Sequence, residues 1–191
     1  MWYIFDMNKI PKLIIVTGRP GSGKTTLADK LGELMYLPVV SRDEIKEGYV
    51  STFNKRHNKL PKEANKIATD TFFKTIKLLL SNNVSMIAEA AFQHKLWLLK
   101  ISKLKKIANV SIIICDIDAQ VAARRHLERG LKNPDREFYH GDNRVTHFRK
   151  TGKFLAAGEW EAPSIDVQTI IVRTSQGYKP NLESIKKKLK R

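Results

Sequence analysis

A glycine-rich segment followed by lysine and threonine constrains the fold of this chain more than any other feature. Residues 18–25 read G-R-P-G-S-G-K-T and match every fixed position of the pattern G-x-x-x-x-G-K-[S/T]. The apolar, β-branched run at residues 12–17 predicts a buried parallel strand before it. Apolar residues at helical spacing over 25–35 predict a helix after it. A strand, a glycine-rich turn and a helix in this order form a phosphate-binding loop.

The residue types in this loop suit a nucleoside triphosphate and Mg²⁺. Glycines let the backbone adopt positive φ angles and direct its N–H groups at phosphate oxygens. We expect Lys24 to reach the β- and γ-phosphates and the Thr25 hydroxyl to ligate Mg²⁺. The alternative is a glycine-rich turn with an exposed lysine. The predicted nucleotide contacts span the loop and the first turn of the helix: Gly18, Pro20, Gly21, Ser22, Gly23, Lys24, Thr25 and Thr26.

Length and composition favour one globular domain covering residues 1–191, with 42% hydrophobic residues. The single cysteine, Cys115, excludes an internal disulfide, and its apolar neighbours predict a buried strand thiol. No apolar run approaches the length of a transmembrane helix, so no membrane partner is expected. The first ten residues make a poor signal peptide. These features predict a cytoplasmic protein.

The net charge of +16, from 35 Lys and Arg against 19 Asp and Glu, is spread along the chain. Such a charge can attract nucleic acid or another polyphosphate. It can equally be a solvated, lysine-rich surface, because no RNA-binding aromatic motif accompanies it. Both interpretations stay open at this stage, and the sequence gives no indication of the oligomeric state.

Strand-like and helix-like segments alternate along the chain. The predicted strands cover about 12–17, 36–40, 84–88, 110–115 and 167–172. The predicted helices cover about 25–35, 41–49, 61–80, 93–107, 118–130 and 182 onward, with a loop at 51–60. Ser41 and Asp118 are expected to cap helices, and Gly130 to end one. This alternation predicts an α/β protein with a parallel sheet and helices on both faces.

Acidic residues follow three of the predicted strands, where open α/β sheets bind their ligands. Asp43, after the second strand, is the candidate for a general base that accepts the proton of an attacking hydroxyl; its alternative is a helix-cap carboxylate beside Arg42. Glu89, after the third strand, could hold Mg²⁺, bind the acceptor or pair with an arginine. Asp116 and Asp118 are expected to be structural or capping residues.

Arginines cluster around the end of the fifth predicted helix. Arg125 and Arg129 are four residues apart, hence on one helix face, and precede a polar segment that contains Arg136 and Arg144. The planar guanidinium group suits bidentate phosphate contacts in a closing lid. The alternative is a solvated helix face paired with Glu128. A histidine in the same segment, His140, is expected to make a loop hydrogen bond rather than bind a metal.

Taken together, these residues resemble the P-loop kinases of the nucleoside-monophosphate-kinase fold. The R-H-L-E-R sequence at 125–129 looks like the lid-entrance arginines of adenylate kinases. The R-D-E sequence at 42–44 is similar to a trio found in the polynucleotide-kinase-like group. That group includes predicted ATP-dependent kinases, AAA-type ATP-binding proteins and the zeta-toxin and chloramphenicol-phosphotransferase relatives.

The resemblance implies a three-layer sandwich with a five-stranded sheet in the order 2-3-1-4-5 and a mobile lid over about 131–150. It places the general base on Asp43 and a phosphate or adenine contact on Arg125. It also places Ser175, in the loop after the fifth strand, beside the adenine of ATP. By the same comparison, Arg42, Asp43, Glu89 and Arg136 would bind the acceptor, and Lys24, Asp43, Arg125 and Arg129 would act in catalysis.

Four hypotheses for function follow. The leading one is an ATP- and Mg²⁺-dependent kinase that phosphorylates a hydroxyl group of a small-molecule or nucleic-acid acceptor. A narrower version is a 5′-hydroxyl polynucleotide kinase, suggested by the net charge and by residues 42–44. A toxin-like phosphotransferase acting on a nucleotide sugar would use the same residues. The fourth is a non-catalytic nucleotide-binding switch, although the chain has no guanine-reading Asn/Thr-Lys-x-Asp motif.

Overall fold

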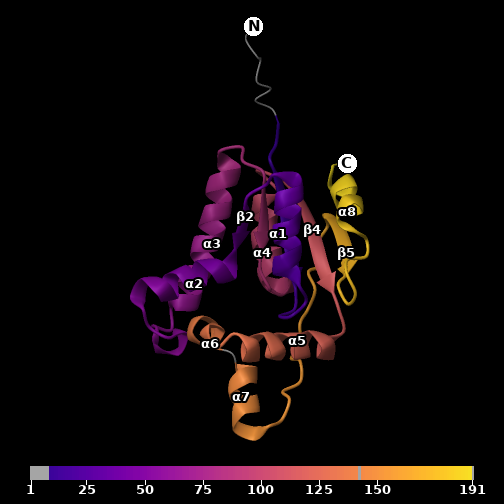
Figure 1. Cartoon of the computed structure of the whole chain (residues 1–191). Coiled ribbons are helices and arrows are strands. Elements are labelled where there is room, and N and C mark those ends of the chain that lie inside the picture. Colours follow the sequence, from indigo (N-terminus) through magenta and orange to yellow (C-terminus); the bar gives the residue numbers. More distant parts are fainter. Residues whose placement is uncertain (1–8, 142, 191) are drawn as a thin grey trace.

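The computed structural model describes residues 9–141 and 143–190. Five parallel strands form one sheet in the order β2-β3-β1-β4-β5, which confirms the predicted fold class and strand order (Figure 1). The strands are β1 (Lys12–Gly18), β2 (Val39–Ser41), β3 (Met86–Glu89), β4 (Asn109–Asp116) and β5 (Gln168–Arg173). β1 lies at the centre, so the phosphate-binding loop leaves the sheet from its middle strand.

Helices cover both faces of the sheet. Alternate residues of β1 point to opposite faces: Leu13 and Ile15 pack under α3 (Ala64–Ser81) and α4 (His94–Leu104). Ile14 and Val16 pack under α1 (Lys24–Met35) and α8 (Leu182–Leu189). The β-branched side chains of β1 are all buried, as a strand covered on both sides requires.

The remaining helices lie at the carboxyl edge of the sheet (Figure 1). They are α2 (Arg42–Phe53), the short 3-10 helix η1 (His57–Lys59), α5 (Ala119–Lys132), α6 (Asp135–His140) and α7 (Asn143–Thr151). The segment expected to be a lid is therefore two short helices, α6 beside α2 and η1, and α7 beside α5. Residue 142 of that segment lies outside the described residues.

Several predicted boundaries are wrong, two of them in helices that carry site residues. The segment 51–60 is not wholly a loop, because α2 continues to Phe53 and ends at Asn54 in the left-handed conformation. The ring of Phe53 contacts that of Tyr49 one turn earlier, with centroids 4.9 Å apart, and this i,i+4 contact stabilises the added turn. α5 also continues past Gly130 to Lys132, because Gly130 is buried inside the helix rather than placed at its end.

Both predicted helix caps are confirmed. The Ser41 hydroxyl accepts a hydrogen bond from the Glu44 amide at the start of α2. The Asp118 carboxylate accepts hydrogen bonds from the amides of Gln120 and Val121 at the start of α5. Each cap satisfies amide groups that have no partner within their own helix. These caps fix where two site-bearing helices begin.

Cys115 is a buried strand thiol, as predicted, and burial raises its pKa to about 12. It is therefore protonated at neutral pH and unsuited to nucleophilic attack. Among the described helices, none combines the length and the hydropathy of a bilayer-spanning segment.

Candidate functional site

The phosphate-binding loop depends on glycine at two positions. Gly21 and Gly23 have φ angles of 85° and 82°, a region that side chains disfavour. A Cβ atom on Gly21 would lie 2.0 Å from the carbonyl oxygen of Ala122 in α5. Gly23 is the N-cap of α1, so the helix begins at Lys24 with Thr25 and Thr26 in its first turn. The loop thus wraps around the positive end of a helix dipole, where phosphate groups are stabilised.

The loop after β5 holds the phosphate-binding loop from the far side. The Thr174 hydroxyl donates to the Ser22 carbonyl at 2.7 Å, and the Thr174 amide donates to the carbonyl of Asp116. Arg125 of α5 donates to the carbonyl oxygens of Thr174 at 2.9 Å and Ser175 at 2.6 Å. The structure thereby brings together Ser22, Arg125 and Ser175, three residues that we predicted to contact the nucleotide.

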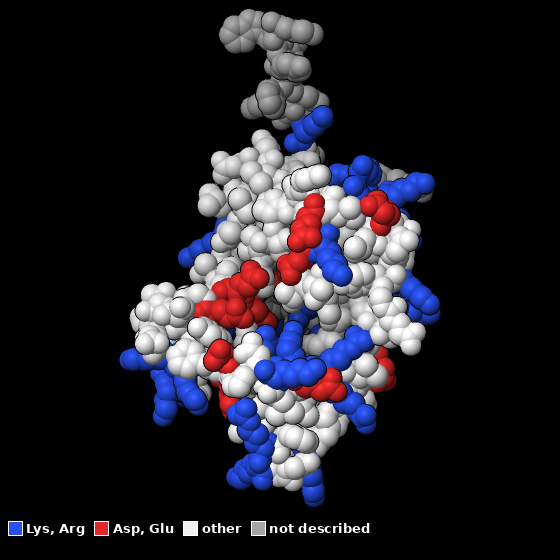
Figure 2. Space-filling view, viewed as in Figure 1, with Lys and Arg blue, Asp and Glu red and all other residues white. Residues whose placement is uncertain are grey.

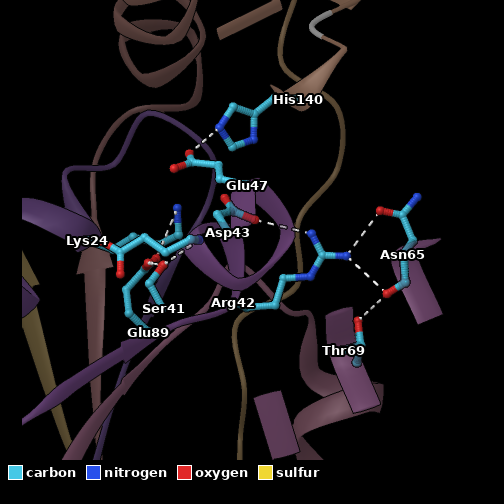
Figure 3. Close-up of polar contacts among 10 residues, drawn as sticks. Lys24, Ser41, Arg42, Asp43, Glu47, Asn65, Thr69, Glu89 and His140 are labelled. Atoms are coloured by element: carbon cyan, nitrogen blue, oxygen red, sulfur yellow. Dashed lines mark hydrogen bonds and ion pairs between the residues drawn. The ribbon is translucent and has the colours of Figure 1, made fainter. Parts of the chain in front are cut away.

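Lys24 meets the acidic residue at the end of β3. Its Nζ lies 3.5 Å from Oε1 of Glu89, and both side chains are buried (Figure 3). The Ser41 hydroxyl donates to Oε2 of Glu89 at 2.8 Å. Ser41 and Glu89 are also register partners in the β2–β3 pair, so strand pairing places the two side chains side by side. Glu89 is thus fixed against the lysine of the loop.

The residues present fit a magnesium ion carried by a nucleotide. Oε1 of Glu89 is buried and has no hydrogen-bond partner among the described residues. Thr25, one residue after Lys24, supplies a second oxygen atom from the first turn of α1. The described residues contain no group of three or more metal-ligating His, Cys, Asp or Glu side chains. Mg²⁺ bound to a triphosphate does not need such a cage, because phosphate oxygens and water complete its coordination.

Asp43 lies in the first turn of α2, facing the same space as Lys24 (Figure 3). Nη1 of Arg42 donates to its Oδ1 at 3.2 Å, and Nη2 of Arg42 donates to the side chain and backbone of Asn65. Burial alone would raise the pKa of Asp43, but the charges of Lys24, Arg42 and His140 outweigh it and hold the pKa below its ordinary value. Asp43 is therefore ionised at neutral pH.

Helix α6 closes on α2 through a histidine and a carboxylate. Nε2 of His140 lies 2.6 Å from Oε1 of Glu47 (Figure 3). Burial and the charge of Arg136 lower the pKa of His140, whereas Asp43 and Glu47 act in the opposite direction. The hydrogen bond predicted for His140 is thus present, and the predicted lid residue Arg136 lies within electrostatic reach of it. Arg129 lies one turn beyond Arg125, in the last part of α5.

Basic side chains gather around the phosphate-binding loop. Figure 2 shows Lys and Arg in a hollow between the lower end of α1 and α5, with Asp and Glu on its rim beside α2. A pocket of about 220 Å³ also adjoins the loop at Arg19 and Pro20, between Gln93, Arg144 and Trp160. The net charge is therefore not only a distant surface feature, since part of it surrounds the candidate site.

Several residues of this site were not predicted from the sequence. Ser41 was expected only as a cap, Thr174 only as part of the loop beside the adenine, and Lys46, Glu47 and His57 were not singled out. A signal for two of them was available: in a helix that begins at residue 42, Lys46 lies one turn from Arg42 and Glu47 one turn from Asp43. Nothing local in the sequence marks Thr174, because its partner Ser22 is 152 residues away.

The geometry has counterparts among solved structures of kinases. A "putative kinase" from Chloroflexus aurantiacus superposes with a TM-score of 0.77 at 22% identity, covering 95% of this chain and 98% of that one. The APS kinase CysC of Mycobacterium tuberculosis, solved with AMPPNP and APS, gives 0.58 at 13% identity, covering 95% and 99%. A chain of the Pnkp1/Rnl/Hen1 RNA repair complex gives 0.57 at 20% identity, covering 85% of this chain and 52% of that one.

These similarities establish a kinase-like P-loop fold, in agreement with the predicted resemblance to P-loop kinases. No curated protein matches the sequence itself. A family model described as an AAA domain, AAA_33, matches residues 13–149, which include the phosphate-binding loop, α2 and most of the predicted lid. The chain belongs to this AAA domain family.

Proposed function

We propose that this protein is a kinase that uses ATP and Mg²⁺ to phosphorylate a hydroxyl group. The observation that carries the proposal is the position of Asp43 in the first turn of α2, where it faces the same space as Lys24 (Figure 3). The charge of Lys24 also acts to lower the pKa of the Asp43 carboxyl group. A proton acceptor placed against the γ-phosphate position is what transfer to a hydroxyl requires. A nucleotide-binding switch has no need of such a carboxylate.

In this mechanism Lys24 and the loop amides hold the β- and γ-phosphates of ATP. The ionised carboxylate of Asp43 takes the proton of the acceptor hydroxyl group. At the same time the hydroxyl oxygen bonds to the γ-phosphorus of ATP, while the bond between that phosphorus and the bridging β–γ oxygen breaks. Thr25 and Glu89 would hold Mg²⁺, whose charge offsets the charge on the phosphate oxygens. Arg42 fixes the Asp43 carboxylate, so the base is oriented before the acceptor arrives.

The predicted lid contributes further cations. In the proposed closed state Arg129 and Arg136 neutralise phosphoryl charge, and Arg125 with Ser175 borders the base of the nucleotide. The contact of Arg125 with the carbonyl oxygens of residues 174–175 supports that position, because it ties α5 to the loop that holds the Ser22 carbonyl.

A 5′-hydroxyl polynucleotide kinase is the second candidate. The net charge of +16 and the basic hollow near α1 and α5 favour it. The pocket of about 220 Å³ beside Arg19 and Pro20, partly open to solvent, instead suits a small ligand. Nucleic-acid binding would fall steeply with salt concentration, whereas binding of a small acceptor would depend on salt more weakly.

Transfer of labelled γ-phosphate from ATP tests both candidates. One reaction contains a 5′-hydroxyl oligonucleotide at low salt, the other a pool of small alcohols, sugars and nucleosides, each with the wild-type protein and with Asp43→Asn. Label on any acceptor that disappears with Asp43→Asn supports the kinase, and the labelled acceptor identifies its class. ATP binding without transfer to either set would contradict the proposal.

A further inference from the structure

A buried lysine lies one turn from the proposed base. Lys46 of α2 is only 5% exposed, and no hydrogen bond or ion pair holds it within the described part of the chain. Burial and the charge of Arg42 lower its pKa to about 8, although Asp43 acts in the opposite direction. Its ammonium nitrogen is not among the buried unpartnered atoms of the described residues, so the stem is buried while the charge stays within reach of a ligand from solvent.

Two further polar atoms nearby are buried without a hydrogen-bond partner among the described residues: Nε of Arg42 and Nδ1 of His57. The outer nitrogens of Arg42 are already used, Nη1 by Asp43 and Nη2 by Asn65. The guanidinium group is therefore held in place with its Nε–H group unused, and that group can only donate. An unused buried donor in a fixed position indicates a site for an acceptor atom that the chain does not supply.

These three groups belong to one electrostatic cluster. The charge of Arg42 lowers the pKa of Lys46, and burial together with the charges of Lys46, His140 and Arg42 lowers the pKa of His57. The groups come from two segments, α2 and η1, and the ring of His57 packs against Gly141 at the end of α6. The two cations, Lys46 and Arg42, repel each other in the free protein, and a negative charge placed between them would remove that repulsion.

The two neighbouring carboxylates do not pair with Lys46. Glu47 pairs with His140, at 2.6 Å, and Asp43 with Arg42, at 3.2 Å. Neither lies within ion-pair distance of Lys46 in the described structure, although Asp43 acts on it from further away. Among the described residues no carboxylate neutralises Lys46, so the cluster suits a negative charge brought by a ligand.

We propose that Lys46, Arg42 and His57 bind an anionic group, a phosphate or a carboxylate, on the acceptor itself. This inference rests on the proposed kinase function and narrows it to acceptors that carry both a hydroxyl group and an anion. Asp43 and Lys46 are three residues apart on α2, so they lie on neighbouring turns of one helix. The bound anion would hold the acceptor while its hydroxyl group faces Asp43 and the γ-phosphate.

Calorimetric titration of inorganic phosphate and, separately, of acetate into the full-length protein tests this inference. The protein is first saturated with Mg²⁺ and AMPPNP, so that the phosphate-binding loop is occupied and cannot take up the probe. We expect one of the two anions to bind the wild-type complex, phosphate if the acceptor carries a phosphate and acetate if it carries a carboxylate. Lys46→Gln should weaken that binding about tenfold or more, the effect of losing a charge-assisted hydrogen bond.

The control variant is Lys77→Gln, which removes an exposed lysine of α3 and should leave anion binding unchanged. AMPPNP affinity, measured in every variant, shows that the protein is folded. Failure of the wild-type protein to bind AMPPNP would contradict the kinase function and this inference together. Normal AMPPNP binding with no binding of either anion, or with equal anion binding in Lys46→Gln, would overturn the inference and leave the kinase function standing.

Discussion

The two sides of the candidate site differ in which of their buried polar atoms lack a hydrogen-bond partner among the described residues. On the nucleotide side, the loop after β5 holds the Ser22 carbonyl through Thr174, and Arg125 is bound by two carbonyl oxygens. On the acceptor side, formed by α2, η1 and α6, the buried atoms Nε of Arg42 and Nδ1 of His57 have no hydrogen-bond partner among the described residues. The nucleotide side holds its backbone in place by internal bonds, and its unpartnered buried atoms are oxygens, Oγ of Ser22 and Oε1 of Glu89, whereas those of the acceptor side are nitrogens.

This difference has a physical reason. Every nucleoside triphosphate presents the same phosphates, so a fixed loop of backbone amides serves all of them and can be fully supported from behind. An acceptor must be distinguished from other molecules, and discrimination comes from polar groups that only the right ligand satisfies. Unused donors at the acceptor side are thus expected of a site that selects its ligand.

The substitution expected to impair the nucleotide side most is Lys24→Ala. This change removes the cation predicted to contact the β- and γ-phosphates and leaves Glu89 buried without its 3.5 Å ion-pair partner. We expect kcat/KM to fall about a thousandfold or more and ATP affinity to fall with it, because the lysine stabilises both the bound triphosphate and the transition state. Lys30→Ala, an exposed residue of the same helix, is the control in a steady-state assay of transfer. Retained ATP affinity in Lys24→Ala would contradict the assignment.

Asp43→Asn should impair phosphoryl transfer on the acceptor side and leave ATP binding on the nucleotide side unchanged. An amide cannot take the proton of the acceptor hydroxyl, so we expect kcat to fall about a hundredfold or more. ATP affinity should stay close to that of the wild-type protein, because Asp43 is assigned to the acceptor rather than the nucleotide. Single-turnover transfer and ATP titration measure the two effects, with Asp70→Asn on α3 as the control. Near-normal turnover in Asp43→Asn would remove Asp43 from the role of base.

The nucleotide side and the sheet could be predicted from sequence because their signals are local. The motif at residues 18–25 specifies backbone conformation through its glycines, and the continuous apolar run of β1 indicates a strand buried on both faces. The strand order came from the resemblance to P-loop kinases, since periodicity alone does not specify which strands are neighbours. The boundary of α2 was wrong because Tyr49 and Phe53 stabilise a turn that their polar neighbours concealed.

The acceptor side resisted prediction because it is assembled from distant segments. His140 reaches Glu47 across 93 residues, and η1 lies beside α6 only through the way the chain folds back. A lysine in a helix gives no sign in the sequence of whether it will be buried. Lys46 is one of several lysines in a chain of net charge +16, and only the structure distinguishes it from the exposed ones.

A smaller effect is expected from Thr174→Val, which tests whether the nucleotide side is supported from behind. The change removes the 2.7 Å hydrogen bond to the Ser22 carbonyl while keeping nearly the same volume. We expect the free energy of unfolding to fall by about 1–3 kcal/mol, because a buried carbonyl loses its donor. Urea denaturation with and without ATP measures the change. Thr169→Val, an exposed position of β5, is the control, and equal stability of the two variants would argue against the support.

The smallest expected effect is a dependence of anion binding at the acceptor side on pH. Because the pKa of Lys46 is about 8, its ammonium group is charged in about half of the molecules at pH 8 and in about a tenth at pH 9. Its titratable neighbours do not change over this range: Asp43 stays ionised, while His57 and His140, whose pKa values are lowered, stay neutral. Binding of sulfate or acetate, both of constant charge, to the AMPPNP complex should therefore weaken about twofold near pH 8 and further above it. A bound anion raises the pKa of Lys46, because its negative charge favours the protonated lysine. In Lys46→Gln this weakening of anion binding with rising pH should vanish. If it persists at the same size in that variant, another group is responsible for the titration.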